Sequence, residues 1–317
     1  MNRRSFLGVA IGAAAATTAR SASNATPILD THIHLFDTNR PQGVPWPSRT
    51  DAVLYKPALP ARYRAIAVQL GVRGAIAIEC SPWFADNRWV LDLAEANPII
   101  VGLIGDLEPA DAQFGKQLDD LHRNPLFLGI RYGNLWGRSL AQSLQNTKFI
   151  EGLKRLSSAG LTLDTANPDP RLLGAVVRTT DAIPNLRVVL DHLPRLEKPT
   201  DANARNACQA DLHELAARPN VFVKVSGVLR RINGRVPEQL SVYKSTLDEL
   251  WDRFGADRLT YGSDWPNSDL WAPYAVELKV VREYFDGKGP VAAEKYFWKN
   301  SVAAYRWKPR DAGQRVV

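Results

Sequence analysis

Short runs of aliphatic and β-branched residues alternate with amphipathic stretches along the chain, and this alternation predicts repeated βα units that share a parallel sheet. Apolar residues recur at helical spacing in the segments Trp89–Asn97, Asp111–His122, Phe149–Ala159, Ala204–Ala217 and Glu238–Phe254. Eight repeats favour an α/β fold of the (β/α)8 TIM-barrel type, because an open doubly wound sheet usually has about five or six strands. The eight predicted strands are Ile28–His34, Arg73–Cys80, Ile99–Asp106, Phe127–Gly133, Gly160–Ala166, Leu186–Leu193, Val221–Gly227 and Leu259–Trp265.

The predicted strands are apolar where they begin and polar where they end. In such a barrel the carboxyl ends of all strands meet at one face, where they and the following loops form the active site. The longest loop, Phe36 to Pro57, contains Trp46, and a loop of this length is more often functional than a simple connection. The polar residues near the strand ends are His34, Glu79, Asp106, Arg131, Asp164, His192, Lys224, Ser226 and Asp264.

The first 23 residues have the features of an export signal. Arg3 and Arg4 precede an apolar run from Phe6 to Ala16, and small residues continue to Ser23. The paired arginines predict a twin-arginine leader over residues 1–23, recognised by the Tat export machinery, and a periplasmic barrel domain over residues 24–317. The run of 11 apolar residues is too short for a stable membrane span, which needs about 20.

The charge and composition of the chain indicate which kind of molecule it binds. The formal net charge of +7 falls to +4 without residues 1–23, which contain three arginines and no acidic residue. The other basic residues are scattered and form no stripe with aromatic residues, so no nucleic acid is expected as a partner. The two cysteines, Cys80 and Cys208, cannot form a disulfide framework. The expected partner is a small-molecule substrate.

Histidines are concentrated at the predicted strand ends. His32 and His34 alternate on the first strand, so at a period of two they project to the same side, together with Asp30. His192 lies near the end of the sixth strand. Asp264 lies near the end of the eighth strand, which is next to the first strand in a closed barrel. These side chains are expected to face one cavity.

A carboxylate beside imidazoles can hold a divalent metal or act as a general base toward water. Other catalytic signatures are absent from the sequence, which has no G-x-S-x-G elbow, no P-loop and no G-x-G-x-x-G fingerprint. Their absence argues against a serine hydrolase and against a nucleotide-dependent enzyme.

Three motifs occur in order at strand ends, over Asp30–His34, Leu190–Pro194 and Gly262–Pro266. Together they resemble the amidohydrolase-related family of the amidohydrolase superfamily, and the resemblance covers essentially all of residues 24–317. Within that family the chain is similar to the lactonase branch, which includes pyrone-dicarboxylate lactonase and sugar-acid lactonases. The resemblance implies a hydrolase of carboxylic ester bonds in lactones. The catalytic residues that it implies are His32, His34, His192 and Asp264.

The chain departs from the superfamily pattern in two places. Metal-dependent members usually have a further histidine on the fifth strand, and Leu161–Ala166 has none. The fourth strand has Arg131 where many relatives have a bridging lysine or a carboxylate. A binuclear centre is therefore not expected. The expected cofactor is either none or a single divalent metal such as Zn²⁺, held by His32, His34 and Asp264.

Substrate contacts are expected around this group. The guanidinium fork of an arginine binds a carboxylate in a bidentate way, and tryptophans near strand ends form apolar walls or stack on a sugar ring. Alternate residues of the seventh strand share a side that can face the pocket. The predicted substrate-binding residues are Arg131, Arg195, Trp83, Trp265 and Lys224, with Trp136 and Ser226 as further candidates.

The leading hypothesis is hydrolysis of a lactone with a carboxylated or sugar-derived ring. Asp264 takes a proton from water, the hydroxide attacks a carbonyl polarised by the three histidines, and Asp264 then protonates the leaving ring oxygen. Two alternatives stay open. One is non-oxidative decarboxylation, which also occurs in the family that the chain resembles. The other is a protein that binds a sugar acid without turnover.

Overall fold

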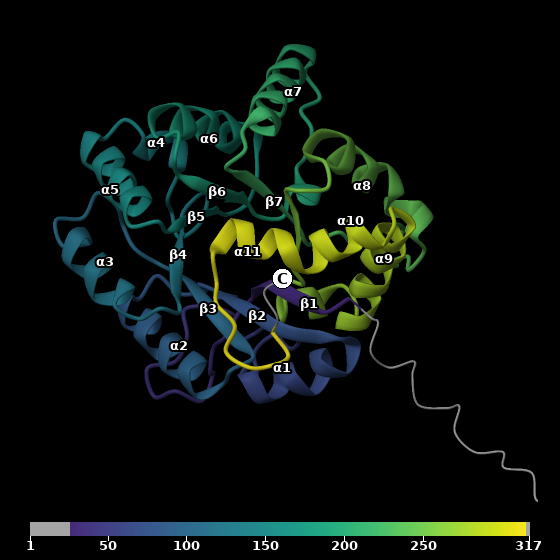
Figure 1. Cartoon of the computed structure of the whole chain (residues 1–317), viewed down its shortest axis with the longest axis horizontal. Coiled ribbons are helices and arrows are strands. Elements are labelled where there is room, and N and C mark those ends of the chain that lie inside the picture. The colour runs from purple at the N-terminus through teal and green to yellow at the C-terminus, as the bar shows by residue number, and fades with distance from the viewer. Residues whose placement is uncertain (1–25, 315–317) are drawn as a thin grey trace, which may run out of the picture.

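The computed structural model describes residues 26–314, and the predicted leader over residues 1–23 lies outside the described residues. One parallel sheet contains eight strands in the order of the chain (Figure 1). This confirms the predicted (β/α)8 barrel, with each strand ending before its predicted boundary. The strands are β1 (Ile28–Ile33), β2 (Val72–Ile78), β3 (Ile100–Gly105), β4 (Phe127–Arg131), β5 (Thr162–Thr165), β6 (Arg187–Leu190), β7 (Val221–Val225) and β8 (Leu259–Tyr261).

The barrel closes between its first and last strands just beyond their ends. An isolated parallel bridge joins Ile33 to Trp265. The amide nitrogen of His34 donates a hydrogen bond to the Trp265 carbonyl at 2.7 Å, and that of Asp264 donates to the His32 carbonyl at 2.9 Å. Closure at this point brings Asp264 beside the two histidines of the first strand.

Helices surround the barrel and connect successive strands (Figure 1). The five predicted helical segments correspond to α2 (Phe84–Ala96), α3 (Phe114–His122), α5 (Thr147–Ser158), α7 (Ala202–Ala217) and α8 (Leu240–Phe254). Local capping fixes some of the starts; for example, the Asp169 carboxylate accepts a hydrogen bond from the Leu172 amide at 2.7 Å. The outer elements are α1 (Pro60–Ala67), η1 (Val68–Leu70), α2 (Phe84–Ala96), α3 (Phe114–His122), α4 (Leu140–Ser143), α5 (Thr147–Ser158), α6 (Pro170–Ala182), η2 (Leu193–Arg195), α7 (Ala202–Ala217), α8 (Leu240–Phe254), η3 (Asn267–Leu270) and α9 (Tyr274–Gly287).

The C-terminal segment covers one end of the barrel. It consists of α10 (Pro290–Glu294), η4 (Lys295–Lys299) and α11 (Asn300–Tyr305), which cross the sheet in Figure 1. The Ala304 carbonyl accepts hydrogen bonds from Thr162 Oγ1 at 3.0 Å and from Arg187 Nε at 2.8 Å. Thr162 and Arg187 begin their strands, so this is the amino-terminal end of the barrel. The strand ends that carry His34, His192 and Asp264 lie at the opposite, carboxyl end of the barrel.

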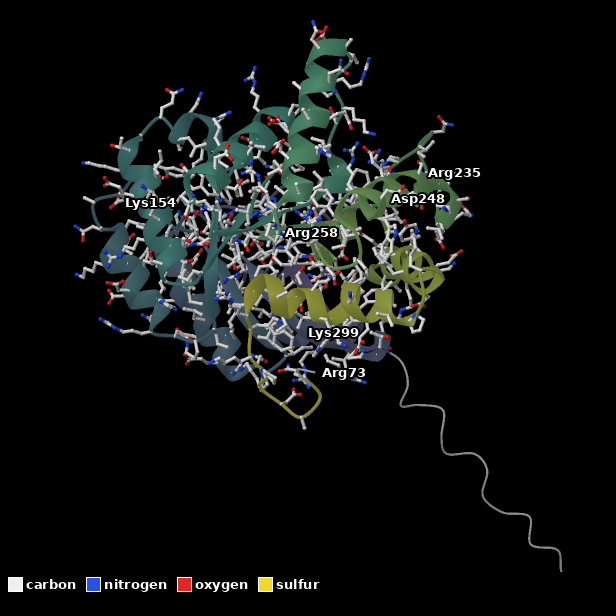
Figure 2. All side chains as sticks on the ribbon, turned by 45° about the horizontal axis from the view of Figure 1, so that its top comes forward. Arg73, Lys154, Arg235, Asp248, Arg258 and Lys299 are labelled. Carbon is white, nitrogen blue, oxygen red and sulfur yellow. The ribbon has the colours of Figure 1, made fainter. Side chains whose placement is uncertain are left out.

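Charged side chains are spread over the outside of the molecule. Figure 2 shows Lys154, Arg235, Arg258 and Lys299 on separate elements. Within residues 26–314, no helix combines the length and the apolar character that crossing a membrane requires.

Candidate active site

The first strand presents its histidines differently from the regular alternation that the sequence predicts. The pairing of β1 with β2 changes register between Asp30 and Ile33. The Asp30 carboxylate accepts hydrogen bonds from Tyr63 at 2.9 Å and Tyr274 at 3.0 Å, which lie on the outer helices α1 and α9. The expectation that Asp30 shares one side with His32 is therefore wrong, because the strand is irregular between them.

His192 and Asp264 lie in loops directly after their strands, and both have left-handed backbone conformations. Their φ angles are 53° and 58°. Such values are uncommon for residues other than glycine, and they cluster at functional sites. Both side chains are nearly fully buried. The two bends direct the imidazole of His192 and the carboxylate of Asp264 toward His32.

Three imidazole nitrogens surround one oxygen of Asp264. The distances to its Oδ1 atom are 3.3 Å from Nε2 of His34, 3.8 Å from Nε2 of His32 and 3.9 Å from Nε2 of His192. None of these contacts has hydrogen-bond geometry, and Oδ1 has no hydrogen-bond donor among the described residues. A buried carboxylate oxygen in this state is available for a proton, a water molecule or a cation.

The other oxygen of Asp264 is already occupied. Asn267 Nδ2 donates a hydrogen bond to Oδ2 at 2.9 Å, and Nη2 of Arg195 lies 3.1 Å from the same atom. Burial alone raises the pKa of the Asp264 carboxyl. The surrounding His192 and His34 rings and the Arg195 guanidinium outweigh burial and hold this pKa well below its usual value. The carboxylate is therefore ionised at neutral pH.

The Nδ1 atoms of His34 and His192 each contact one polar atom of the protein. His34 Nδ1 lies 3.0 Å from the Ile78 carbonyl oxygen, and His192 Nδ1 lies 2.7 Å from the Ser226 hydroxyl. These contacts direct both Nε2 atoms toward Asp264. Burial, with Arg195 as a further cause, lowers the pKa of His192 to about 3. This ring is therefore neutral at neutral pH, the form in which an imidazole binds a metal.

The residues present fit a single divalent metal. Ligand atoms of His32, His192 and Asp264 lie within 4.8 Å of one another. Both ring nitrogens of His32 are buried and lack a hydrogen-bond partner within residues 26–314. Two imidazoles and a carboxylate form a typical zinc ligand set. The group differs from the predicted one in one member, because it contains His192 in place of His34.

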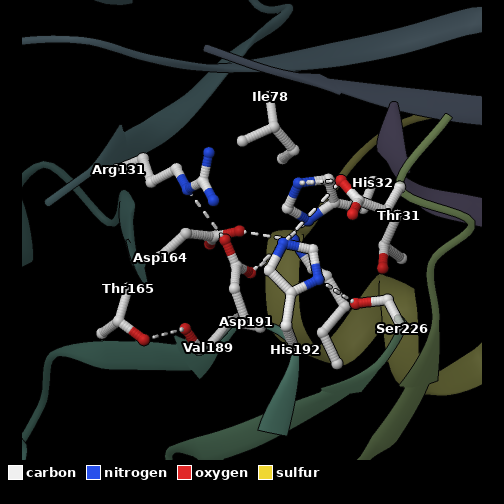
Figure 3. A network of polar contacts seen from close by, with 12 residues as sticks. Thr31, His32, Ile78, Arg131, Asp164, Thr165, Val189, Asp191, His192 and Ser226 are labelled. Carbon is white, nitrogen blue, oxygen red and sulfur yellow. Dashed lines mark hydrogen bonds and ion pairs between the residues drawn. The ribbon is translucent and has the colours of Figure 1, made fainter. Parts of the chain in front are cut away.

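A buried network of charges adjoins the histidines, and Figure 3 shows Arg131, Asp164 and Asp191 of this network beside His32 and His192. The ammonium of Lys224 is 2.7 Å from Asp164 and 2.9 Å from Asp191. The Nε atom of Arg131 is 3.0 Å from Asp191. Lys224, predicted to contact the substrate, is 0% exposed and is not among the residues that line the cavity beside Asp264. The positive charge of Lys224 neutralises the buried carboxylates of Asp164 and Asp191.

A cavity of about 240 Å³ is lined in part by Asp264, His34 and His192. Sequence reasoning did not assign several of its lining residues to the site. Glu79 is one of them, although it was recognised as a polar strand end. Trp46 comes from the long loop after β1, whose length was the available signal. The lining residues are His34, Trp46, Glu79, Cys80, Arg131, Leu135, Trp136, Asn167, His192, Arg195, Asp264 and Asn267.

Glu79 has a defined environment in this cavity. Trp136 Nε1 donates a hydrogen bond to Glu79 Oε2 at 3.0 Å, and Nη1 of Arg131 lies 3.7 Å from Oε1. Burial raises the pKa of Glu79 to about 6. Trp136 thus lies in the cavity wall, as expected for a tryptophan after a strand.

Two other predicted wall residues do not line the cavity. Trp265 is 0% exposed, and it packs against the ring of Tyr63 at 5.3 Å and the guanidinium of Arg62 at 5.0 Å. Its side chain therefore points toward α1. Trp83 is 38% exposed at the start of α2. The structure therefore places neither of these predicted substrate-binding residues in the cavity beside Asp264.

Comparison with known proteins identifies relatives over most of the chain. The L-fucono-1,5-lactonase of Burkholderia ambifaria is 31% identical over 88% of this chain and 95% of its own length. The L-fucono-1,5-lactonase of Burkholderia multivorans is 25% identical over 91% of this chain and 98% of its own length. A crystal structure of an amidohydrolase from Burkholderia multivorans with bound zinc has the same fold, with a TM-score of 0.77, 22% identity, and coverage of 89% of this chain and 100% of that chain.

The family model described as amidohydrolase matches residues 29–307, which include every strand from β2 to β8 and all but the first residue of β1. The motifs that carried the resemblance in the sequence are the segments that the structure brings together around Asp264. The chain belongs to the amidohydrolase family.

Proposed function

We propose that the protein hydrolyses the ester bond of a sugar lactone. The observation that carries this proposal is the carboxylate of Asp264, which lines the cavity and whose Oδ1 atom has no hydrogen-bond donor among the described residues. The L-fucono-1,5-lactonase at 31% identity supports the same reaction class.

Asp264 is the acid–base group of the proposed reaction, and two neighbouring side chains orient it. Arg195 and Asn267 hold Oδ2 of Asp264, so that Oδ1 accepts a proton from water as the water attacks the lactone carbonyl. The protonated carboxyl then donates this proton to the ring oxygen as the C–O bond breaks. One hydroxy acid is formed, and Asp264 returns to its ionised state. General acid–base catalysis of this kind typically contributes about 10²- to 10⁴-fold in rate.

A divalent metal would be held by His32, His192 and Asp264, whose ligand atoms converge. When bound, it would supply Lewis-acid polarisation of a carbonyl and would lower the pKa of water. His34 would remain beside it, with Nε2 facing Asp264.

The charges of the cavity favour an uncharged substrate. Arg131 is paired with Asp191 and lies near Glu79, and Arg195 is paired with Asp264. Neither cation is left to neutralise a substrate carboxylate, in contrast to the role expected from the sequence. Glu79 and the neighbouring asparagines suit hydroxyl groups instead, and a volume of about 240 Å³ suits a single ring, since small-molecule sites typically span about 300–1,000 Å³.

A lactone panel tests this function. Purified protein is assayed with uncharged aldono-lactones and with carboxylated lactones of the same ring size, each with and without chelator, while CO2 release from aromatic acids is followed in parallel. Faster opening of uncharged lactones is expected. Preferred opening of carboxylated lactones contradicts the substrate assignment. CO2 release without lactone opening indicates a decarboxylase, and saturable binding without turnover indicates a binding protein.

We also propose that the protein is exported to the periplasm by the Tat machinery, on the basis of Arg3 and Arg4 before the apolar run Phe6–Ala16. Fractionation of cells that produce the wild type and a variant with both arginines changed to lysine tests this. Export of the double-lysine variant at the wild-type level contradicts it.

A further inference from the structure

Arg195 stands between the active-site cavity and a larger cavity outside it. Its Nη2 atom lies 3.1 Å from Oδ2 of Asp264, while 29% of its side chain is exposed. The outer cavity has a volume of about 620 Å³ and is lined by residues of η2, α7 and α8 together with Trp271. The guanidinium lies 5.9 Å from the ring of Trp271. A long side chain between two open spaces needs a support that prevents it from swinging outward.

Gly227, just after β7, provides the space for this guanidinium. A Cβ atom at Gly227 would lie 2.0 Å from Nε, 2.5 Å from Cζ and 2.7 Å from Nη2 of Arg195, whereas real Cβ atoms essentially never approach within 3.0 Å of another atom. The planar guanidinium therefore lies directly against the glycine backbone. No other residue leaves room for Arg195 in this position.

The backbone at Gly227 is held from behind by Glu277 on α9. Gly227 has a φ angle of +63°, in the left-handed region. The Glu277 carboxylate accepts a hydrogen bond from the Val228 amide, next to Gly227, at 3.0 Å. Glu277 is only 3% exposed. The bend that receives Arg195 is thus fixed by a buried carboxylate on a neighbouring helix.

We propose that Gly227 is a positioning residue that acts through Arg195: the absence of a side chain at Gly227 places the guanidinium on Oδ2 of Asp264 and leaves Oδ1 for the reaction. This inference rests on the proposed function for its activity readout. It assigns to Arg195 the orientation of Asp264 in place of the substrate carboxylate expected from the sequence.

The test compares G227A with G234A. Gly234 also has a left-handed φ, +78°, but nothing lies within 4 Å of the position of its Cβ. G234A therefore measures the cost of backbone strain without a collision. We expect G227A to lower kcat/KM by about 100-fold, the loss that a displacement of about 1 Å can cause, while G234A stays near the wild-type value. Equal effects of the two variants overturn the proposal.

A double-mutant comparison separates action through Arg195 from a general structural effect. In an R195A background the space is empty, so adding G227A is expected to cause little further loss of kcat/KM. If G227A lowers kcat/KM by the same factor in both backgrounds, Gly227 does not act through Arg195. If G227A alone does not fold, recovery of folding in R195A/G227A supports the collision, and failure of that variant to fold contradicts it.

A crystal structure of G227A is a test that is independent of the reaction. In G227A the guanidinium is expected to have left its 3.1 Å contact with Asp264, and a guanidinium in its original place overturns the proposal. If the wild type opens no lactone, the proposed function fails while this structural comparison still decides the role of Gly227.

Discussion

The Nε2 atom of His34 lies 3.3 Å from Oδ1 of Asp264. The Nδ1 atom of the same ring contacts the Ile78 carbonyl, which can only accept, so Nδ1 carries a proton. In the neutral ring Nε2 then presents a lone pair to a carboxylate oxygen. Two electron-rich atoms at this distance are stabilised by a cation or a proton between them.

Metal binding should depend on these rings unequally. We expect wild-type protein to bind one Zn²⁺ per chain, measured by elemental analysis after dialysis. H192A is expected to weaken zinc affinity more than H34A, because His192 belongs to the convergent group with His32 and Asp264. Competition with a chromophoric chelator gives the affinities. A larger loss in H34A than in H192A contradicts this ligand set.

Asp264→Asn should remove the proton acceptor while keeping the size of the side chain. We expect kcat to fall by about 10²- to 10⁴-fold on the best lactone. Asp269→Asn is the matched control, because Asp269 lies on η3 and pairs with Arg62 at 2.8 Å, away from the cavity lining. Normal turnover by D264N, or an equal loss in D269N, rules out the proposed role of Asp264.

Lys224→Met should destabilise the fold. Its ammonium is the cation between Asp164 and Asp191, which are both 0% exposed. Removing one partner of a buried ion pair typically costs about 3–5 kcal/mol in the free energy of unfolding, which urea denaturation measures. Lys244→Met is the control, since the Lys244–Asp248 pair is exposed to solvent and is expected to contribute little to stability. Similar losses in the two variants contradict this account of the buried network.

Trp136→Phe should weaken substrate binding. The change keeps an aromatic wall but removes the N–H group that donates to Glu79 at 3.0 Å. An unsatisfied buried acceptor costs about 1–3 kcal/mol, so KM is expected to rise by roughly 5- to 150-fold. Trp83→Phe, outside the cavity, is expected to leave KM unchanged. A rise of KM in W83F alone reverses the assignment of the two tryptophans.

Glu277 should make the stability of the fold depend on pH. Burial raises its pKa to about 7, from an ordinary value of 4.5, so the folded chain holds this proton more tightly than the unfolded chain. The stabilising contribution is fully present below pH 4.5 and is lost as the pH rises through about 7. Glu277→Gln should flatten the decrease in Tm over this range. An unchanged slope argues against the raised pKa of Glu277.

The sequence predicted where polar chemistry gathers, because strand periodicity and the order of eight repeats fix the carboxyl face of a barrel. It did not predict side-chain direction just beyond the strands. Trp265 follows Asp264, whose left-handed backbone turns the chain so that the indole packs on α1. Lys224 lies within β7, but its burial depends on Asp164 and Asp191 from other strands. Such pairings are set by tertiary contacts that no local pattern contains.

The bridge between Ile33 and Trp265 has a consequence for biogenesis. His32 and Asp264 come from opposite ends of the barrel sequence, and they meet only where the first and eighth strands join. Until the ribosome has released the eighth strand, the nascent chain has no assembled site at which to hydrolyse a substrate. Activity is therefore expected only after all eight strands have been synthesised and the barrel has closed.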